Sequence, residues 1–233
     1  MSVNKKILFI SHHKDVELGS MKNFFIEYKF DFDIIKPLHG ETLPSNLEKW
    51  RGVIILGGAM NVGDLVEYPK LIDELNWIKN IISHQKSTLG ICLGAQLIAK
   101  ASGAKVGPHI KDMVEIGYKE VIIKNNNAYF SGFPKKVFHW HAQGTTLPNN
   151  AAHIATNSIF DIQAFSINNK IFGFQFHPEV TEETILNWNN KSFNMLKRAG
   201  ASSKNDQLND HKHYSREVEL WFNNFLKHWL DLN

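Results

Sequence analysis

The chain has little cysteine, with Cys92 as the single thiol among 233 residues. One cysteine cannot form an intrachain disulfide, which excludes a disulfide-rich secreted fold and makes a reducing compartment the expectation. The sequence also lacks long apolar runs, so it offers no candidate membrane span. Its N-terminus has no extended apolar region and no small-residue cleavage site, which argues against a signal peptide. We therefore expect a cytoplasmic protein that does not associate with membranes.

A charge excess of one sign is missing as well, because 26 basic residues face 23 acidic ones and the net charge is +3. The lysines are dispersed rather than clustered, so we expect no nucleic-acid partner. Twelve histidines are many for this length, and some are neighbours, at residues 12–13, 139–141 and 211–213. None of these groups lies beside cysteines or carboxylates at the spacing of a zinc site. The sequence therefore predicts no metal site, and we expect no cofactor.

The N-terminal half alternates between short apolar segments and amphipathic ones. Strands are expected at residues 5–10, 31–35 and 52–56, and the last has no polar residue in its interior, as in a parallel sheet buried on both faces. Helices are expected at residues 15–28 and 68–82, where apolar side chains recur at helical spacing. This alternation predicts a doubly wound, mainly parallel α/β sheet.

Beyond residue 110 the pattern changes to short strand candidates separated by turns, at residues 121–123, 137–141, 153–156, 163–167 and 171–176. They predict a mixed or antiparallel section attached to the parallel core. Thr181 then begins a helix with two acidic residues in its first turn, where they suit the helix dipole.

The C-terminal segment carries an apolar stripe at helical spacing from Val218 to Leu230. We interpret it as a helix packed on the same domain, and the alternative is a docking face for another subunit. Residues 199–213 before it are polar and predict a mobile linker. The expected organisation is thus one domain over residues 1–198, a linker over 199–213 and a packed helix over 214–233.

Cys92 stands at the turn between a short apolar strand and an alanine-containing helical pattern, with Gly90 and Gly94 on either side. A nucleophile between a strand and a helix is held in a tight bend, and flanking glycines avoid side-chain clashes there. The N-terminus of the following helix favours a thiolate over a thiol. The alternative is that Cys92 is a small buried apolar residue.

A second chemical signal is His177, which directly follows an apolar strand that Pro178 ends. Glu179 lies two residues further on, so a small turn can bring its carboxylate to the imidazole. A catalytic thiol needs a base that takes its proton and returns one to the leaving group, and an acid that orients that base. Cys92, His177 and Glu179 could supply these three roles, whereas a lone structural histidine is the alternative.

The segment Gly-Ile-Cys-Leu-Gly-Ala-Gln at residues 90–96, followed by His-Pro-Glu at 177–179, resembles the class I, triad-type glutamine amidotransferases. The pattern is similar to stand-alone proteins that look like the glutaminase half of GMP synthase. Further matches lie within about residues 50–185, namely Gly57-Gly58, Glu67-Tyr68-Pro69, Glu115-Ile116-Gly117-Tyr118, Trp140-His141 and Gln163-Ala164-Phe165. The resemblance implies a flavodoxin-like α/β fold.

The same resemblance implies roles for individual residues. Cys92 would attack the γ-carboxamide of L-glutamine to form a glutamyl thioester, with His177 activating it and protonating the departing ammonia, and Glu179 orienting His177. The backbone N–H groups of Gly58 and Leu93 would form the oxyanion hole. Gln96 matches a substrate-contacting position of the family, and His141 lies in a segment that lines the same pocket.

Two departures from the family bear on specificity. Ala59 stands where relatives have proline, and Ala142-Gln143-Gly144 replaces their Gly-Asp-Thr after Trp140-His141. An open pocket around Gln143 and Gly144 would favour a γ-glutamyl peptidase over a glutaminase. A non-catalytic binding or regulatory protein on the same scaffold is a third interpretation. Residues beyond about 185 are too few for a synthetase domain, so any ammonia acceptor is expected on another polypeptide.

Overall fold

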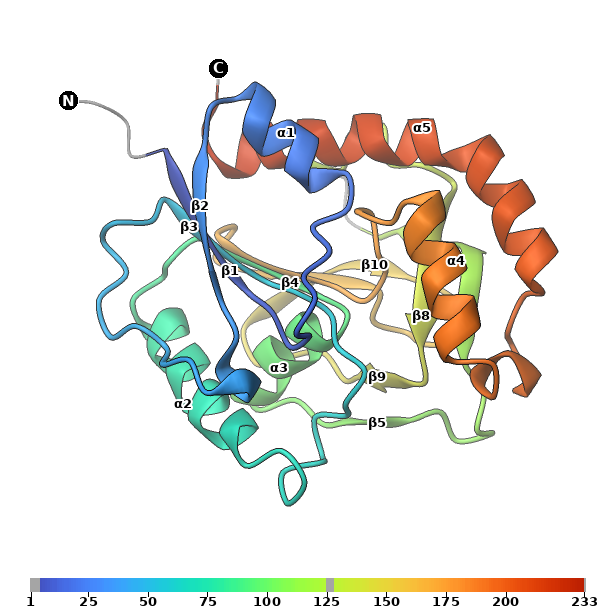
Figure 1. Ribbon diagram of the computed structural model, residues 1–233, viewed down its shortest axis with the longest axis horizontal. Helices are drawn as coiled ribbons and strands as arrows, with labels where there is room; N and C mark the ends of the chain where they lie inside the picture. The colour runs from blue at the N-terminus through green and yellow to red at the C-terminus, as the bar shows by residue number, and fades with distance from the viewer. Residues whose placement is uncertain (1–4, 125–127, 233) are drawn as a thin grey trace.

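The computed structural model describes residues 5–124 and 128–232. An eight-stranded sheet runs through the molecule with helices on both faces (Figure 1). Its parallel part has the order β2 (Asp31–Ile35), β1 (Lys6–Ile10), β3 (Gly52–Ile55), β4 (Thr88–Ile91) and β12 (Ile171–Phe174). Three antiparallel strands extend it, in the order β11 (Ala164–Ile167), β10 (Ala151–Thr156) and β7 (Ile122–Ile123).

Successive side chains of the central strands point to opposite faces, so each strand contributes to two hydrophobic cores. In β1, Ile7 and Phe9 belong to the core beneath α1 and α5, whereas Leu8 and Ile10 belong to the core beneath α2 and α3. The helices are α1 (Met21–Glu27), α2 (Lys70–Ser83), α3 (Leu93–Ala101), α4 (Glu182–Lys191) and α5 (Lys204–Trp229). This architecture confirms the predicted α/β class, with its mainly parallel sheet, antiparallel section and C-terminal helices.

Two antiparallel ribbons lie outside the main sheet. They are β5 (Val106–Pro108) with β9 (Gln143–Thr145), and β6 (Glu115–Glu120) with β8 (Lys136–His141). Of these strands, the sequence periodicity predicted β8 alone. The described residues also form three short 3₁₀ helices, at Pro37–His39, Ala128–Phe130 and Met195–Lys197. Across residues 5–124 and 128–232, no helix is long and apolar enough to cross a membrane.

The first helix begins later than predicted, at Met21 rather than near residue 15. Gly19 has a left-handed backbone with φ +56, which interrupts helical geometry just before the helix. A side chain at Gly19 would also overlap the backbone carbonyl of Glu179. The backbone N–H of Ser20 donates to that carbonyl at 2.9 Å. The segment before α1 is therefore a loop held against Glu179.

Residues 204–213, predicted as part of a linker, form the first turns of α5, so that prediction is wrong for them. Ser203 caps the helix by accepting a hydrogen bond from a backbone N–H of its first turn at 3.2 Å. The inner side of these turns is polar: Gln207 accepts a hydrogen bond from Asn189 at 2.9 Å, and both side chains are buried. Such a face lacks the apolar stripe on which helix prediction depends. The stripe of the later turns is buried in the core.

Candidate active site

Cys92 lies between β4 and α3 with φ +49 and ψ −105, a backbone conformation that costs a residue with a side chain about 1–3 kcal/mol. Close packing around the turn holds it there. A Cβ at Gly90 would lie 2.6 Å from backbone atoms of Gly94, and one at Gly94 would overlap the carbonyl of Ile55. The backbone N–H of Cys92 donates to Phe174 at 2.7 Å, which ties the turn to β12. The predicted strand–turn–helix geometry at the thiol is therefore present, and both glycines are required by space.

His177 follows β12 and lies beside the thiol. Its Nδ1 is 2.8 Å from Oε1 of Glu179, and its side chain forms a hydrogen bond with Cys92. Burial opposes protonation of the ring, but the charges of Glu179 and Cys92 outweigh burial and raise the pKa of His177 to about 10. The ring also packs edge-on against Trp188 with centroids 4.8 Å apart. A protonated imidazole is thus held between a carboxylate and the sulfur.

The end of β3 faces this group. A Cβ built on Gly57 would lie 3.0 Å from Cε1 of His177 and 3.7 Å from Cβ of Cys92, and one on Gly58 would lie 2.6 Å from Leu93. Leu93 is the first residue of α3, where a backbone N–H has no partner within the helix. The structure therefore brings Gly58 and Leu93 together beside Cys92, and their role as an oxyanion hole stays a prediction.

A buried histidine–glutamate pair contacts this glycine segment. Nδ1 of His12, just after β1, contacts the carbonyl of Gly57 at 3.3 Å, and its Nε2 lies 3.1 Å from Glu74 on α2. Both side chains are fully buried. Burial lowers the pKa of His12, but the Glu74 carboxylate outweighs it and raises the pKa. The sequence analysis did not predict this pair. An acidic residue between Leu71 and Ile78, on the apolar face of α2, could have indicated a buried partner for Glu74.

The two predicted substrate-contacting residues are buried and hydrogen-bonded to protein groups. Nε2 of Gln96 donates to the carbonyl of Gln143 at 2.9 Å and to Oε1 of Gln175 at 3.1 Å. Nδ1 of His141 contacts the same Gln143 carbonyl at 2.9 Å. Gly144 is also buried, and a Cβ there would overlap the ring of Phe160. Contact of Gln96 and His141 with substrate stays a prediction, and the strand at Gly144 is packed rather than open.

In contrast to the expectation from sequence spacing, one buried carboxylate lies beside two of the histidines. Glu115, His139 and His141 place one ligand atom each within 4.8 Å of one another, and all three are buried. Burial alone would raise the pKa of Glu115, but the two histidines and a hydrogen bond from Gln163 lower it to about 2. Burial lowers the pKa of His139 to about 3. The sequence analysis missed the group because Glu115 is distant in sequence and reaches His141 only through the β6–β8 register.

Comparisons with known proteins agree on one family. A sequence profile described as "Glutamine amidotransferase class-I" matches residues 20–188. The crystal structure of a glutamine amidotransferase from Thermotoga maritima matches with a TM-score of 0.89 and 30% identity, covering 98% of this chain and 99% of that chain. One subunit of the glutamine-hydrolyzing GMP synthase of Methanococcus aeolicus is 30% identical over 135 residues, 56% of this chain and 65% of the relative. Gamma-glutamyl peptidase 3 of Arabidopsis thaliana is 25% identical over 175 residues, 70% of this chain and 69% of the relative.

The profile match spans most of the chain and includes the strand ends that carry Gly58, Cys92 and His177. The Thermotoga structure matches nearly the whole of both chains. This protein therefore belongs to the class-I glutamine amidotransferase family.

Proposed function

We propose that the protein is a cysteine-dependent hydrolase of γ-glutamyl amides and that L-glutamine is its substrate. The observation that carries the proposal is the contact of Cys92 with His177, which is itself 2.8 Å from Glu179, at a strained turn before a helix. A thiol beside a protonated imidazole reacts as a thiolate. Family membership supplies the class of substrate.

In the proposed reaction, the thiolate of Cys92 attacks the γ-carbonyl carbon and the carbonyl electrons move to oxygen. The backbone N–H groups of Gly58 and Leu93 stabilise that oxyanion, a contribution worth about 10²–10³ in rate per donor. Nε2 of His177 gives its proton to the departing nitrogen, so ammonia leaves and a thioester remains. His177 then takes a proton from water, which attacks the thioester and releases glutamate. Glu179 keeps Nδ1 of His177 protonated and Nε2 toward the sulfur throughout.

A γ-glutamyl peptide is the second candidate substrate, because it presents the same carbonyl with a larger leaving group. The resemblance to the Arabidopsis γ-glutamyl peptidase supports it. Packing of Gly144 against Phe160 favours glutamine, since it closes the segment that an extended leaving group would need open. The assembled triad speaks against a purely binding role. The resemblance to the Methanococcus GMP synthase chain supports a separate acceptor subunit for the ammonia.

The test measures ammonia and amine release from L-glutamine and from a γ-glutamyl dipeptide, with the wild type, Cys92→Ala and His84→Asn side by side. His84 is an exposed histidine outside the site, so His84→Asn serves as the control variant and should keep the wild-type activity. Release from glutamine that Cys92→Ala abolishes supports the glutaminase, whereas preference for the dipeptide supports the peptidase. A diazoketone analogue of glutamine should label Cys92 even if turnover awaits a partner. Silence on both substrates together with no labelling would reject both enzymatic proposals.

A further inference from the structure

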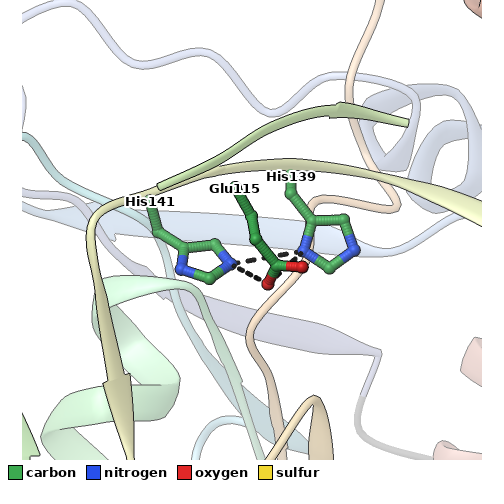
Figure 2. A group of neighbouring side chains, drawn as sticks. All are labelled: Glu115, His139 and His141. Carbon is green, nitrogen blue, oxygen red and sulfur yellow. Dashed lines mark hydrogen bonds and ion pairs between the residues drawn. The ribbon is translucent and has the colours of Figure 1, made fainter. Parts of the chain in front are cut away.

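A second cluster of chemically active side chains includes two residues of β8, the strand whose main chain contacts the thiol. Glu115 on β6 and His141 on β8 are directly opposite each other in the antiparallel register. His139 is two residues earlier on β8 and so points to the same face. Figure 2 shows the carboxylate of Glu115 between the two imidazoles, with one ring nitrogen of each turned toward it. The side chains of Glu115 and His139 are fully buried, and that of His141 is 2% exposed.

The spacing of the three converging atoms is that of ligands around one ion. Nδ1 of His139 lies 3.3 Å from Nε2 of His141, and Oε2 of Glu115 lies 3.7 Å and 3.2 Å from these two nitrogens. A triangle with these sides has a point about 2 Å from every corner, which is the bond length of Zn²⁺ to imidazole nitrogen and carboxylate oxygen. The three ligand atoms therefore already lie at separations that suit one shared ion.

Hydrogen bonding also determines which ring nitrogen of His141 faces the cluster. Nδ1 of His141 must donate to the carbonyl of Gln143, 2.9 Å away, because a carbonyl oxygen only accepts. In neutral His141 this leaves a lone pair on Nε2, aimed at the carboxylate of Glu115. Two lone pairs at 3.2 Å repel each other unless a proton or a metal ion lies between them. A proton donated by Nδ1 of His139 or shared with Glu115, or a metal ion, can occupy that position.

The surrounding groups orient the ligands as they do in metal sites. Nε2 of Gln163 donates to Oε2 of Glu115 at 2.7 Å, and Asn157 donates to the other carboxylate oxygen at 2.5 Å. The Gln143 carbonyl fixes the tautomer of His141 that ligates through Nε2. Oε1 of Gln163 is buried and has no hydrogen-bond partner among the residues that the structure describes. It is a further polar atom near the cluster with unused acceptor capacity.

We propose that Glu115, His139 and His141 bind a divalent transition-metal ion of the Zn²⁺ type. Two imidazoles and one carboxylate favour such ions over Mg²⁺ and Ca²⁺, which take mainly oxygen ligands. The ion would hold both histidines of β8 in place. The residue between them, Trp140, has its carbonyl oxygen 3.8 Å from Sγ of Cys92. The site therefore anchors the strand segment that lies against the thiol, and it takes no part in bond making or breaking.

The test uses the full chain carrying Cys92→Ala, because the thiol beside His177 would otherwise bind Zn²⁺ by itself. This protein is produced in Zn²⁺-supplemented medium and also refolded with Zn²⁺, then desalted and assayed for metal by mass spectrometry. We expect close to one ion per chain. Refolding with Co²⁺ in place of Zn²⁺ should give visible d–d absorption bands of a nitrogen- and oxygen-ligated ion, and the unfolding temperature should rise with either metal.

Ligand variants locate the ion on the same background. Glu115→Gln and His139→Gln should each lose most of the bound metal, whereas His84→Gln, at an exposed histidine, should keep it. Circular dichroism checks that each variant folds. If the ligand variants do not fold, the Co²⁺ spectrum of the Cys92→Ala protein tests whether the bound ion has nitrogen and oxygen ligands. A metal content below about a tenth of an ion per chain, together with no Co²⁺ absorption bands, would overturn the proposal and leave a proton between His141 and Glu115. Metal retained in both folded ligand variants would also overturn it.

Discussion

Replacement of Glu179 by glutamine tests the proposed division of labour in the triad. The carboxylate is 2.8 Å from Nδ1 of His177, in a site where both side chains are at least nine-tenths buried. Its charge is the largest of the influences that raise the pKa of His177 to about 10 against the opposing effect of burial. An opposite charge this close is typically responsible for about 1–3 pH units of such an increase. In Glu179→Gln the imidazolium should therefore lose its proton about 1–3 pH units lower.

The assay is the pH profile of kcat and kcat/KM for γ-glutamyl amide hydrolysis. The alkaline limb should move down by that amount, and kcat at neutral pH should fall by about 10²–10⁴, the range of an orienting acid and a general acid–base. Glu183→Gln, an exposed acid in the first turn of α4, is the matched control and should leave the profile unchanged. An unmoved alkaline limb with wild-type kcat in Glu179→Gln would refute the orienting role.

Three further outcomes follow from the described contacts. Glu74→Gln removes the carboxylate that faces the buried His12 ring and raises its pKa, so urea unfolding at about pH 5, where that ring is protonated, should show a loss of about 3–5 kcal/mol. A loss below about 1 kcal/mol would mean that the two residues do not form a buried charge pair. Ser203→Ala removes the cap of α5 and should cost about 1 kcal/mol in the same assay, whereas no loss would show that the first turn frays in the wild type. The pKa of His177 is raised from 6.5 to about 10, so its contribution to stability is complete below pH 6.5 and is lost as the pH rises through about 10. The free energy of unfolding of the wild type relative to His177→Asn should therefore fall over that interval. A constant difference would contradict the raised pKa.

The placement of the proposed metal site has a consequence for interpreting activity. His139 and His141 lie on β8 with Trp140 between them, and the Trp140 main chain contacts the thiol. His141 was predicted as a substrate contact from its position in the family pattern. Its ring nitrogens contact Glu115, His139 and the carbonyl of Gln143. Lower activity after substitution of His141 would therefore report on the position of β8 as much as on substrate binding.

Sequence alone determined the features whose causes are local. The turn at Cys92 needs a strand, two glycines and a helix start within a few residues, and each leaves a mark in the sequence. His177 and Glu179 are two residues apart, so their contact at 2.8 Å depends only on a small turn. The alternating pattern likewise predicted the parallel core, because strands that are apolar on both faces are typical of parallel sheets covered by helices.

Tertiary structure alone decided the contacts between residues distant in the chain. The pairing of His12 with Glu74 depends on where α2 packs against the end of β1, and that of Glu115 with His141 depends on the β6–β8 register. The periodicity of the sequence predicts neither of these pairings, since a polar residue on a buried face is identified as buried only when its partner is known. The same reason explains the start of α5: Gln207 is an inward-facing residue because Asn189 from another helix meets it there.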